Sequence, residues 1–172
     1  QVALGNIYNF SNELGVNRKA DADPTNILRH CILTSLKSYK KKYGKEYGEL
    51  VICCDGRNYW RKGVFPFYKA NRKKKRESSD LDWKAIFDAI ALIRDELIEN
   101  FRYKVINIDE CEGDDIIAVL TKNTDNFGSH EPVLIISSDS DFKQLHQVGS
   151  HVKQWSPIQK KYIKYTQKEI EE

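Results

Sequence analysis

The sequence contains no methionine, only four prolines and four cysteines, and no apolar run of the length that crosses a membrane. A membrane-spanning helix needs about 20 consecutive, mainly apolar residues. No signal-peptide pattern opens the chain either, so we expect a cytoplasmic protein. Because no methionine stands at position 1 and the last residues, 167–172, form a charged helical stretch without a terminator, we expect both ends of the protein to lie outside this sequence.

The cysteines and histidines do not have the spacing of a metal site. Cys53 and Cys54 are adjacent in an apolar run, Cys31 falls in a helical stretch, and Cys111 stands alone. This pattern excludes a zinc finger and a disulfide framework, and indicates buried, reduced thiols. The four histidines, for which we expect structural or surface positions, are His30, His130, His146 and His151.

Acidic and basic residues are separated along the chain, although the net charge is only +3. The segment 57–76 has no acid and carries Arg57, Arg61, Lys62, Lys69, Arg72, Lys73, Lys74, Lys75 and Arg76. The acids gather at 109–115 and at Asp139 and Asp141. One part of the chain can therefore hold phosphate while the other holds a metal ion.

Apolar periodicity predicts alternating helices and strands in a single domain of 172 residues. The predicted helices cover residues 24–42, 79 or 80 to 98, and 114–120. The predicted strands cover residues 50–54, 103–108, 132–136 and 152–155. This order is typical of βαβ units, and so of an α/β three-layer sandwich with a central, mainly parallel sheet and helices on both faces.

Three predicted strands end in acidic residues. Asp55 follows the first, Asp109 and Glu112 follow the second, and Asp139 and Asp141 follow the third. Ligands of such sheets bind beyond the carboxyl ends of the strands, and unpaired carboxylates gathered there repel one another unless a cation lies between them. Oxygen ligands alone favour Mg²⁺ or Mn²⁺, and two such ions about 3.5–4 Å apart can promote phosphodiester hydrolysis. Helix capping is the alternative explanation for 112–115 and for Asp141.

Aromatic residues interleave with the basic ones after the first strand, in 59–62 and 65–72. Lysine and arginine bind phosphate, and flat rings stack on unpaired bases. A solvated basic loop is the alternative, and the same segment suits a loop that becomes ordered over nucleic acid.

Several motifs together resemble the flap endonuclease/5′-3′ exonuclease family, and within it the ribonuclease H type of T-even bacteriophages. They are Asp55, Tyr59-Trp60-Arg61, Tyr68-Lys69-x-Asn71-Arg72, Glu112-x-Asp114-Asp115, Ser137-Ser138-Asp139-Ser140-Asp141-Phe142 and Val152-Lys153-Gln154-Trp155-Ser156-Pro157. The resemblance covers nearly the whole chain. It implies a PIN-like 5′-nuclease domain with a helical arch insertion at about 72–80.

The resemblance also implies the roles of individual residues. The metal ligands would be Asp55, Glu112, Asp114, Asp139 and Asp141, with Asp115 nearby or acting through water. Lys69 and Arg72 would contact the scissile phosphate, with Arg61 close by. Nucleic acid would be bound by Arg61, Tyr68, Lys69, Arg72, Lys73, Lys74, Lys75 and Arg76.

By the same resemblance, the protein would be a monomer that uses two Mg²⁺ ions, replaceable by Mn²⁺. It would remove RNA primers and flaps from DNA and RNA–DNA duplexes in lagging-strand synthesis, in the cytoplasm of an infected bacterium. A single-strand-binding protein or a sliding clamp would be a partner.

The sequence departs from the family pattern in three respects. The first family aspartate is expected before Gln1, and the last acidic ligands with a helix-three-turn-helix are expected after Glu172. Gly113 stands where the family has alanine. A PIN-type ribonuclease, a noncatalytic nucleic-acid-binding module of the same fold and an Asp-x-Asp phosphatase are the alternatives.

Overall fold

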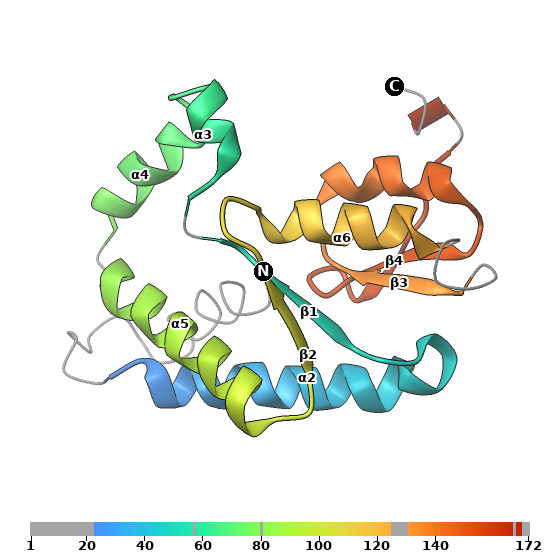
Figure 1. Ribbon diagram of the computed structural model, residues 1–172, viewed down its shortest axis with the longest axis horizontal. Helices are drawn as coiled ribbons and strands as arrows, with labels where there is room; N and C mark the ends of the chain where they lie inside the picture. Colours follow the sequence, from blue (N-terminus) through green and yellow to red (C-terminus); the bar gives the residue numbers. More distant parts are fainter. Residues whose placement is uncertain (1–22, 57, 80, 125–130, 167, 170–172) are drawn as a thin grey trace.

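The computed structural model describes residues 23–56, 58–79, 81–124, 131–166 and 168–169. Their elements alternate along the chain as α/β units (Figure 1). The helices are α2 (Thr25–Tyr47), α3 (Trp60–Val64), α4 (Ala70–Glu77), α5 (Trp83–Asn100), α6 (Gly113–Lys122) and the 3₁₀-helix η1 (Ser140–Val148). The strands are β1 (Val51–Cys54), β2 (Lys104–Asn107), β3 (Val133–Ile136), β4 (Val152–Ser156) and β5 (Lys161–Ile163).

Helices α2 and α5 pack together against the parallel pair β1–β2. Leu28 of α2 and Ile93 of α5, only 2% and 1% exposed, lie at the centre of this core. Ile52 and Val105 extend it from the two strands. Apolar side chains at helical spacing are what bring these elements together, as the periodicity predicts.

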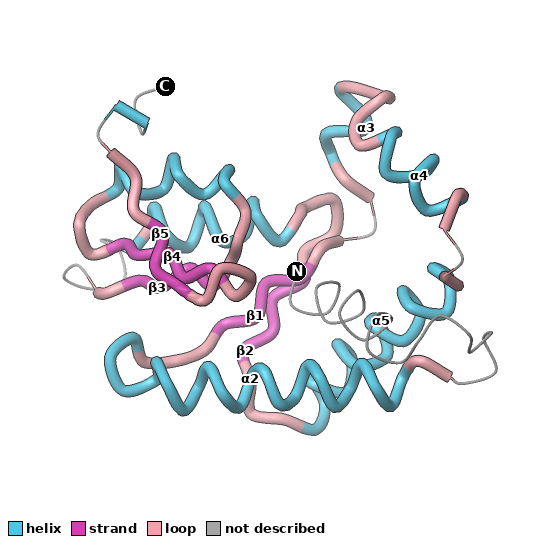
Figure 2. Tube along the Cα trace, turned by 180° about the vertical axis from the view of Figure 1, so that it is seen from behind, coloured by secondary structure: helices cyan, strands magenta, loops and turns pink. Residues whose placement is uncertain are grey.

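The second sheet consists of β3, β4 and β5, with β3 parallel and β5 antiparallel to β4. Helix α6 and η1 pack together, and Ile135, Phe142, Leu145 and Val152 form the core beneath them. Helix α2 reaches this sheet too, because the rings of Tyr43 and Trp155 lie 5.9 Å apart. Helices thus cover both faces of the strands, with α2 and α5 on one side and α6 and η1 on the other (Figures 1 and 2).

The α/β fold with mainly parallel strands is as predicted, with differences in detail. Hydrogen bonds among the described strands link β1 to β2, and β3 to β4 and β5, so these strands form two hydrogen-bonded groups. Helix α2 continues through Gly44 to Tyr47, beyond the predicted end at residue 42. Tyr39, Tyr43 and Tyr47 contact one another at four-residue spacing along it, with ring centroids 6.5 Å apart in a stacked pair and 6.4 Å apart in an edge-on pair.

The start of α5 also differs from the prediction. Its cap is Asp82, whose carboxylate accepts from the Ala85 amide at 3.0 Å, whereas Ser79 accepts from the Leu81 amide in the preceding turn. The four cysteines are free but only half-buried. No helix among the described residues is long and apolar enough to span a bilayer.

The basic segment contains two helices, α3 and α4, joined through a turn at residues 66–69. Helices α3 and α4 form an arm between β1 and α5 that stands apart from the two cores (Figures 1 and 2). The expected arch, 72–80, therefore includes most of α4, while residue 80 lies outside the described part of the chain. A solvated loop is not what this segment forms.

Candidate metal and phosphate site

Glu112 joins the basic arm to the acidic edge of the fold. It is the N-cap of α6 and is only 3% exposed. Its carboxylate accepts hydrogen bonds from three side chains of the arm: Tyr68 Oη at 2.7 Å, Lys69 Nζ at 2.5 Å and Arg61 Nη1 at 3.0 Å. A carboxylate this deeply buried is tolerable only when it is paired in this way.

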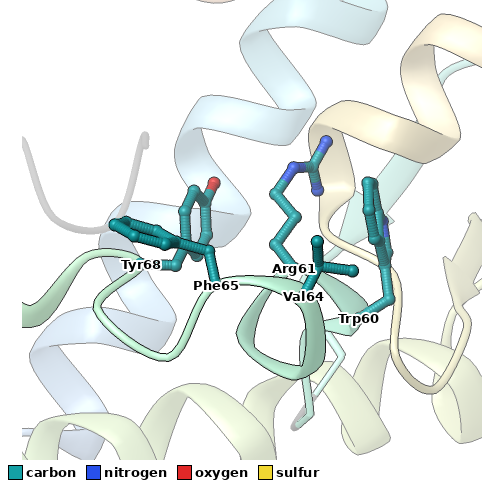
Figure 3. Close-up of a pocket in the computed structure, with 5 residues that line it drawn as sticks. All are labelled: Trp60, Arg61, Val64, Phe65 and Tyr68. Carbon is teal, nitrogen blue, oxygen red and sulfur yellow. The ribbon is translucent and has the colours of Figure 1, made fainter.

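Arg61 forms a second, two-pronged pair with Asp115. Its two terminal nitrogens donate to the Asp115 carboxylate at 2.7 and 2.5 Å. The guanidinium carbon lies 4.7 Å from the Trp60 ring centroid and 5.8 Å from that of Tyr68. Figure 3 shows Arg61 between these rings, in a shallow pocket that Val64 and Phe65 complete. Ion pairing and ring contacts therefore hold this arginine in one place.

These contacts set the charge state of both acids. Burial raises the pKa of Glu112, but the hydrogen bonds from Lys69 and Tyr68 outweigh it and leave that pKa below its usual value. The Arg61 hydrogen bonds lower the pKa of Asp115. The expectation that the gathered carboxylates are unpaired is thus wrong for these two, because the arm supplies their counter-charges.

Helix capping and ion pairing coexist at the start of α6. Asp115 Oδ2 accepts from the Glu112 amide at 3.1 Å, as a first-turn acid does when it closes a helix N-terminus. The capping interpretation of 112–115 is therefore correct, and the same residues also meet the basic arm.

Asp55, directly after β1, is held against the beginning of α6. Its Oδ1 accepts from the Gly113 amide at 2.7 Å, and its backbone carbonyl accepts from the Asn107 side chain at 2.9 Å. An added Cβ at Gly113 would lie 3.0 Å from the Cys53 carbonyl oxygen. Glycine at this position thus lets α6 approach the end of β1 closely.

Carboxylates from three parts of the chain affect the pKa of Asp114. Burial raises its pKa, and the charges of Asp139 and Asp55 raise it further. Glu112 acts in the same direction, and the charge of Lys69 opposes them. The predicted convergence of acids after separate strands is therefore present as an electrostatic effect at Asp114.

Asp139 follows β3 and caps η1, since its Oδ1 accepts from the Asp141 amide at 3.1 Å. Asp141 is exposed in the first turn of η1, so the expectation of an N-cap at Asp141 is wrong by two residues. Asp109 is also exposed, in the turn before α6.

The donor set has the chemistry of a hard divalent cation site. Asp55, Asp114 and Asp139 offer only oxygen, and the raised pKa of Asp114 marks negative charge that a cation would stabilise. Within the ranges that the structure describes, however, no three acids, histidines or cysteines stand close enough to enclose an ion. The residues fit such a cation by their chemistry, while Glu112 and Asp115 are already neutralised by the arm.

The remaining predicted phosphate ligands are more dispersed. The Arg72 side chain is exposed. Its backbone lies close to Lys69, because the Arg72 amide donates to the Lys69 carbonyl oxygen at 3.0 Å. Arg76 instead packs on α5, with its guanidinium 5.5 Å from the Phe87 ring. Lys73, Lys74 and Lys75 lie in α4, but their side chains are outside the described part of the structure.

Three residues near the site lay outside the predicted set of site residues. The Asn107 side chain holds the Asp55 backbone, Tyr59 has a pKa raised by burial and by Asp55, and Gln154 contacts the loop that carries Asp139. Asn107 is the exposed last residue of β2, and Gln154 lies in β4, which mixes polar and apolar residues, so the sequence carries no clear signal for either. Tyr59 carries no such signal beyond its place in the aromatic segment.

A family model described as the 5′-3′ exonuclease N-terminal resolvase-like domain matches residues 7–172. The chain belongs to the 5′-3′ exonuclease family. It is 40% identical over 168 residues to a ribonuclease H of Enterobacteria phage T4, covering 95% of this chain and 52% of that protein. It is 31% identical over 119 residues to an exonuclease of Escherichia phage T7, covering 68% and 36%.

Solved structures of the family share the fold. A T5 5′-exonuclease with bound divalent metal ions (zinc) has a TM-score of 0.62 at 19% identity, covering 91% of this chain and 53% of that one. A bacteriophage T5 flap endonuclease complexed with DNA and metal ions has a TM-score of 0.57 at 21% identity, covering 84% and 50%. The chain thus spans about half the length of the T4 and T5 proteins and 36% of the T7 exonuclease.

Proposed function

We propose that this chain carries the catalytic site of a metal-dependent, structure-selective 5′-nuclease, with 5′-3′ exonuclease and flap-endonuclease activity. The observation that carries the proposal is the meeting of Lys69, Arg61 and Tyr68 with Glu112, beside Asp114. Cations for a phosphate and carboxylates for a metal ion thus lie side by side. The ribonuclease H name of the T4 relative and the DNA and metal ions of the T5 complex support it.

In this proposal, acidic residues bind the metal ions and basic residues bind the phosphate. Asp55, Asp114 and Asp139 would hold the divalent ions, with Asp141 and the paired acids Glu112 and Asp115 completing their surroundings. Two Mg²⁺ ions, replaceable by Mn²⁺, would supply an activated water and stabilise the leaving oxygen of an in-line phosphodiester hydrolysis.

Lys69, Arg61 and Arg72 would bind the scissile phosphate and offset the charge that develops on it. An arriving phosphate competes with Glu112 for Lys69 and Arg61, so substrate binding and release of these ion pairs are coupled. Lys73, Lys74, Lys75 and Arg76 add positive charge along the arm, and Tyr68 offers a ring to an unpaired base.

The proposed substrates are DNA and RNA–DNA duplexes with free 5′ ends or flaps, as in removal of RNA primers from lagging strands. The proposed setting is the cytoplasm of an infected bacterium, since the relatives come from bacteriophages. A single-strand-binding protein or a sliding clamp is the proposed partner of a monomer.

The test is cleavage of a 5′-labelled flap substrate and of a matched blunt duplex, each with Mg²⁺, with Mn²⁺ and with EDTA. Metal-dependent release of short 5′ products, faster from the flap, is the expected result. Binding without cutting under every condition would point to a noncatalytic module. Cutting restricted to single-stranded RNA would favour a PIN-type ribonuclease.

A further inference from the structure

The buried face of β4 is polar where a core strand is ordinarily apolar. Val152, Gln154 and Ser156 alternate inward along this strand. Gln154 and Ser156 are 1% and 0% exposed, although neither is apolar. Buried polar side chains persist only when their hydrogen bonds are satisfied, so the partners of these two residues explain why they are there.

Both residues bind the loop 137–139 that follows β3. Gln154 Nε2 donates to the carbonyl oxygen of Ser137 at 2.9 Å and to that of Asp139 at 2.8 Å. The Ser156 hydroxyl shares a hydrogen bond of 2.7 Å with the Ser138 hydroxyl. Every residue of this loop is therefore held by a side chain of β4.

The Gln154 amide is also held from its other side. Its Oε1 lies 3.4 Å from His146 Nε2, and the His146 ring packs edge-on against Tyr165 at 5.0 Å between centroids. A primary amide is the uncharged group that offers two N–H donors on one nitrogen together with an acceptor oxygen. An apolar residue of similar size would leave the backbone carbonyls of Ser137 and Asp139 without this donor.

We propose that Gln154 is a positioning residue that sets the place of the Asp139 carboxylate through the Asp139 backbone. The inference rests on the proposed function, in which Asp139 holds a divalent ion. Groups behind a metal ligand fix its orientation, and their loss typically weakens metal affinity or activity by about 10–100-fold. Ser156 assists by holding Ser138, and neither residue touches the substrate or the ion.

The experiment compares Gln154→Leu and Gln154→Glu with the control Val152→Ala. Leucine removes both donors, and glutamate keeps the size of the side chain while placing an oxygen where the donor was. Val152 is buried in the same strand, 4% exposed, and packs in the apolar core. The control therefore loosens the same sheet without removing a hydrogen bond to the loop.

Two quantities are measured for each protein at equal folded fraction. One is Mg²⁺ and Mn²⁺ affinity by calorimetry without DNA, and the other is kcat and KM on the flap substrate. Both Gln154 variants should bind metal at least about tenfold more weakly and lose kcat with little change in KM. Raising the metal concentration should restore part of the kcat, whereas Val152→Ala should keep wild-type metal affinity.

Equal metal affinity and kcat in the Gln154 variants and in Val152→Ala would overturn the positioning role. If Gln154→Leu and Gln154→Glu do not fold, Ser156→Ala carries the same comparison through the Ser138 contact. A several-fold loss of metal affinity there supports the inference, and wild-type affinity refutes it. A wild-type protein that cuts no 5′ substrate would instead refute the proposed function and this inference with it.

Discussion

Lys69 Nζ lies 2.5 Å from Glu112 Oε1. The lysine proposed to bind phosphate therefore forms an ion pair with a carboxylate at the start of α6. Its backbone has a φ of 56°, a left-handed conformation that is uncommon outside glycine. Holding a residue there costs about 1–3 kcal/mol, which the surrounding contacts must offset. Glu112, with its three donors from the arm, is the anchor that keeps Lys69 in this position.

Replacing Lys69 tests whether this cation acts on the reacting phosphate. Lys69→Ala should lower kcat by about 10²-fold with a smaller change in KM, since a cation beside developing negative charge acts mainly in the transition state. Single-turnover cleavage of the flap substrate measures this. Alanine shares the cost of the positive φ, so the backbone strain does not change with the substitution.

A matched lysine elsewhere provides the control for Lys69. Lys84 pairs with Asp88 on the exposed side of α5, where its side chain is 85% exposed. Lys84→Ala should leave kcat unchanged. A Lys69→Ala effect confined to binding would remove Lys69 from the reacting centre.

Asp139→Asn tests the metal assignment after β3. The amide keeps the shape and the capping acceptor of the side chain but weakens metal binding, so cleavage should be lost while DNA binding is largely kept. Filter binding and cleavage on the same flap substrate measure both. Asp88→Asn, in an exposed ion pair on α5, is the control and should cut normally. Full activity of Asp139→Asn would remove Asp139 from the metal site.

The strands and core helices could be predicted because their signals are local. The runs 50–54 and 132–136 are short and apolar, and β1 and β3 fall inside them. The repeat of Ile86, Ile93 and Leu97 predicts the buried face of α5. The predicted end of the first helix at residue 42 is too early, because the contacts of Tyr43 with Tyr39 and Tyr47 continue past Gly44 along α2.

The site was predictable by residue type but not by pairing. Acids that follow strands indicate a common edge of the fold, and the charges of Asp139 and Asp55 do raise the pKa of Asp114. The sequence does not show that Arg61, 54 positions away, reaches Asp115, because that contact depends on how the arm folds back. The polar residues of β4 were visible as well, but their partners emerge only when β3 and β4 pair.

The Arg61–Asp115 pair should make stability depend on acid pH. Its hydrogen bonds hold the pKa of Asp115 below the usual 3.8. A carboxylate whose pKa is lower in the folded state stabilises the fold at pH values above its unfolded-state pKa. This stabilisation is lost as the pH falls through the folded-state pKa. Urea unfolding of Arg61→Ala should show a loss of about 1 kcal/mol at neutral pH and a flatter decline below about pH 4. Coincident curves for wild type and variant would show that the pair contributes nothing.

Asp114 should weaken the fold when no metal is bound. Burial and its acidic neighbours raise its pKa, so the ionised side chain is less stable here than in an aspartate exposed to water. Asp114→Asn should therefore raise the Tm in EDTA by about 2–4 °C, the shift expected from about 1 kcal/mol in a domain of this size. Mg²⁺ should stabilise the wild type and have less effect on the variant. Calorimetric scans with and without Mg²⁺ measure both, and a lower Tm in EDTA would contradict the repulsion.

The lysines of α4 should govern how binding depends on salt, and the chain offers a matched control. Lys73, Lys74 and Lys75 are consecutive in α4, and Lys40, Lys41 and Lys42 are consecutive and exposed in α2. Changing either triplet to glutamine removes the same charge.

Each lysine that no longer neutralises a phosphate should reduce the slope of log K against log salt by about 0.9 on duplex DNA. The α4 triplet should flatten this slope and leave the rate at saturating substrate nearly unchanged, because the proposed role of these lysines is to bind the strand and not the reacting phosphate. The α2 triplet should change neither, and equal flattening by both triplets would show that only net charge matters.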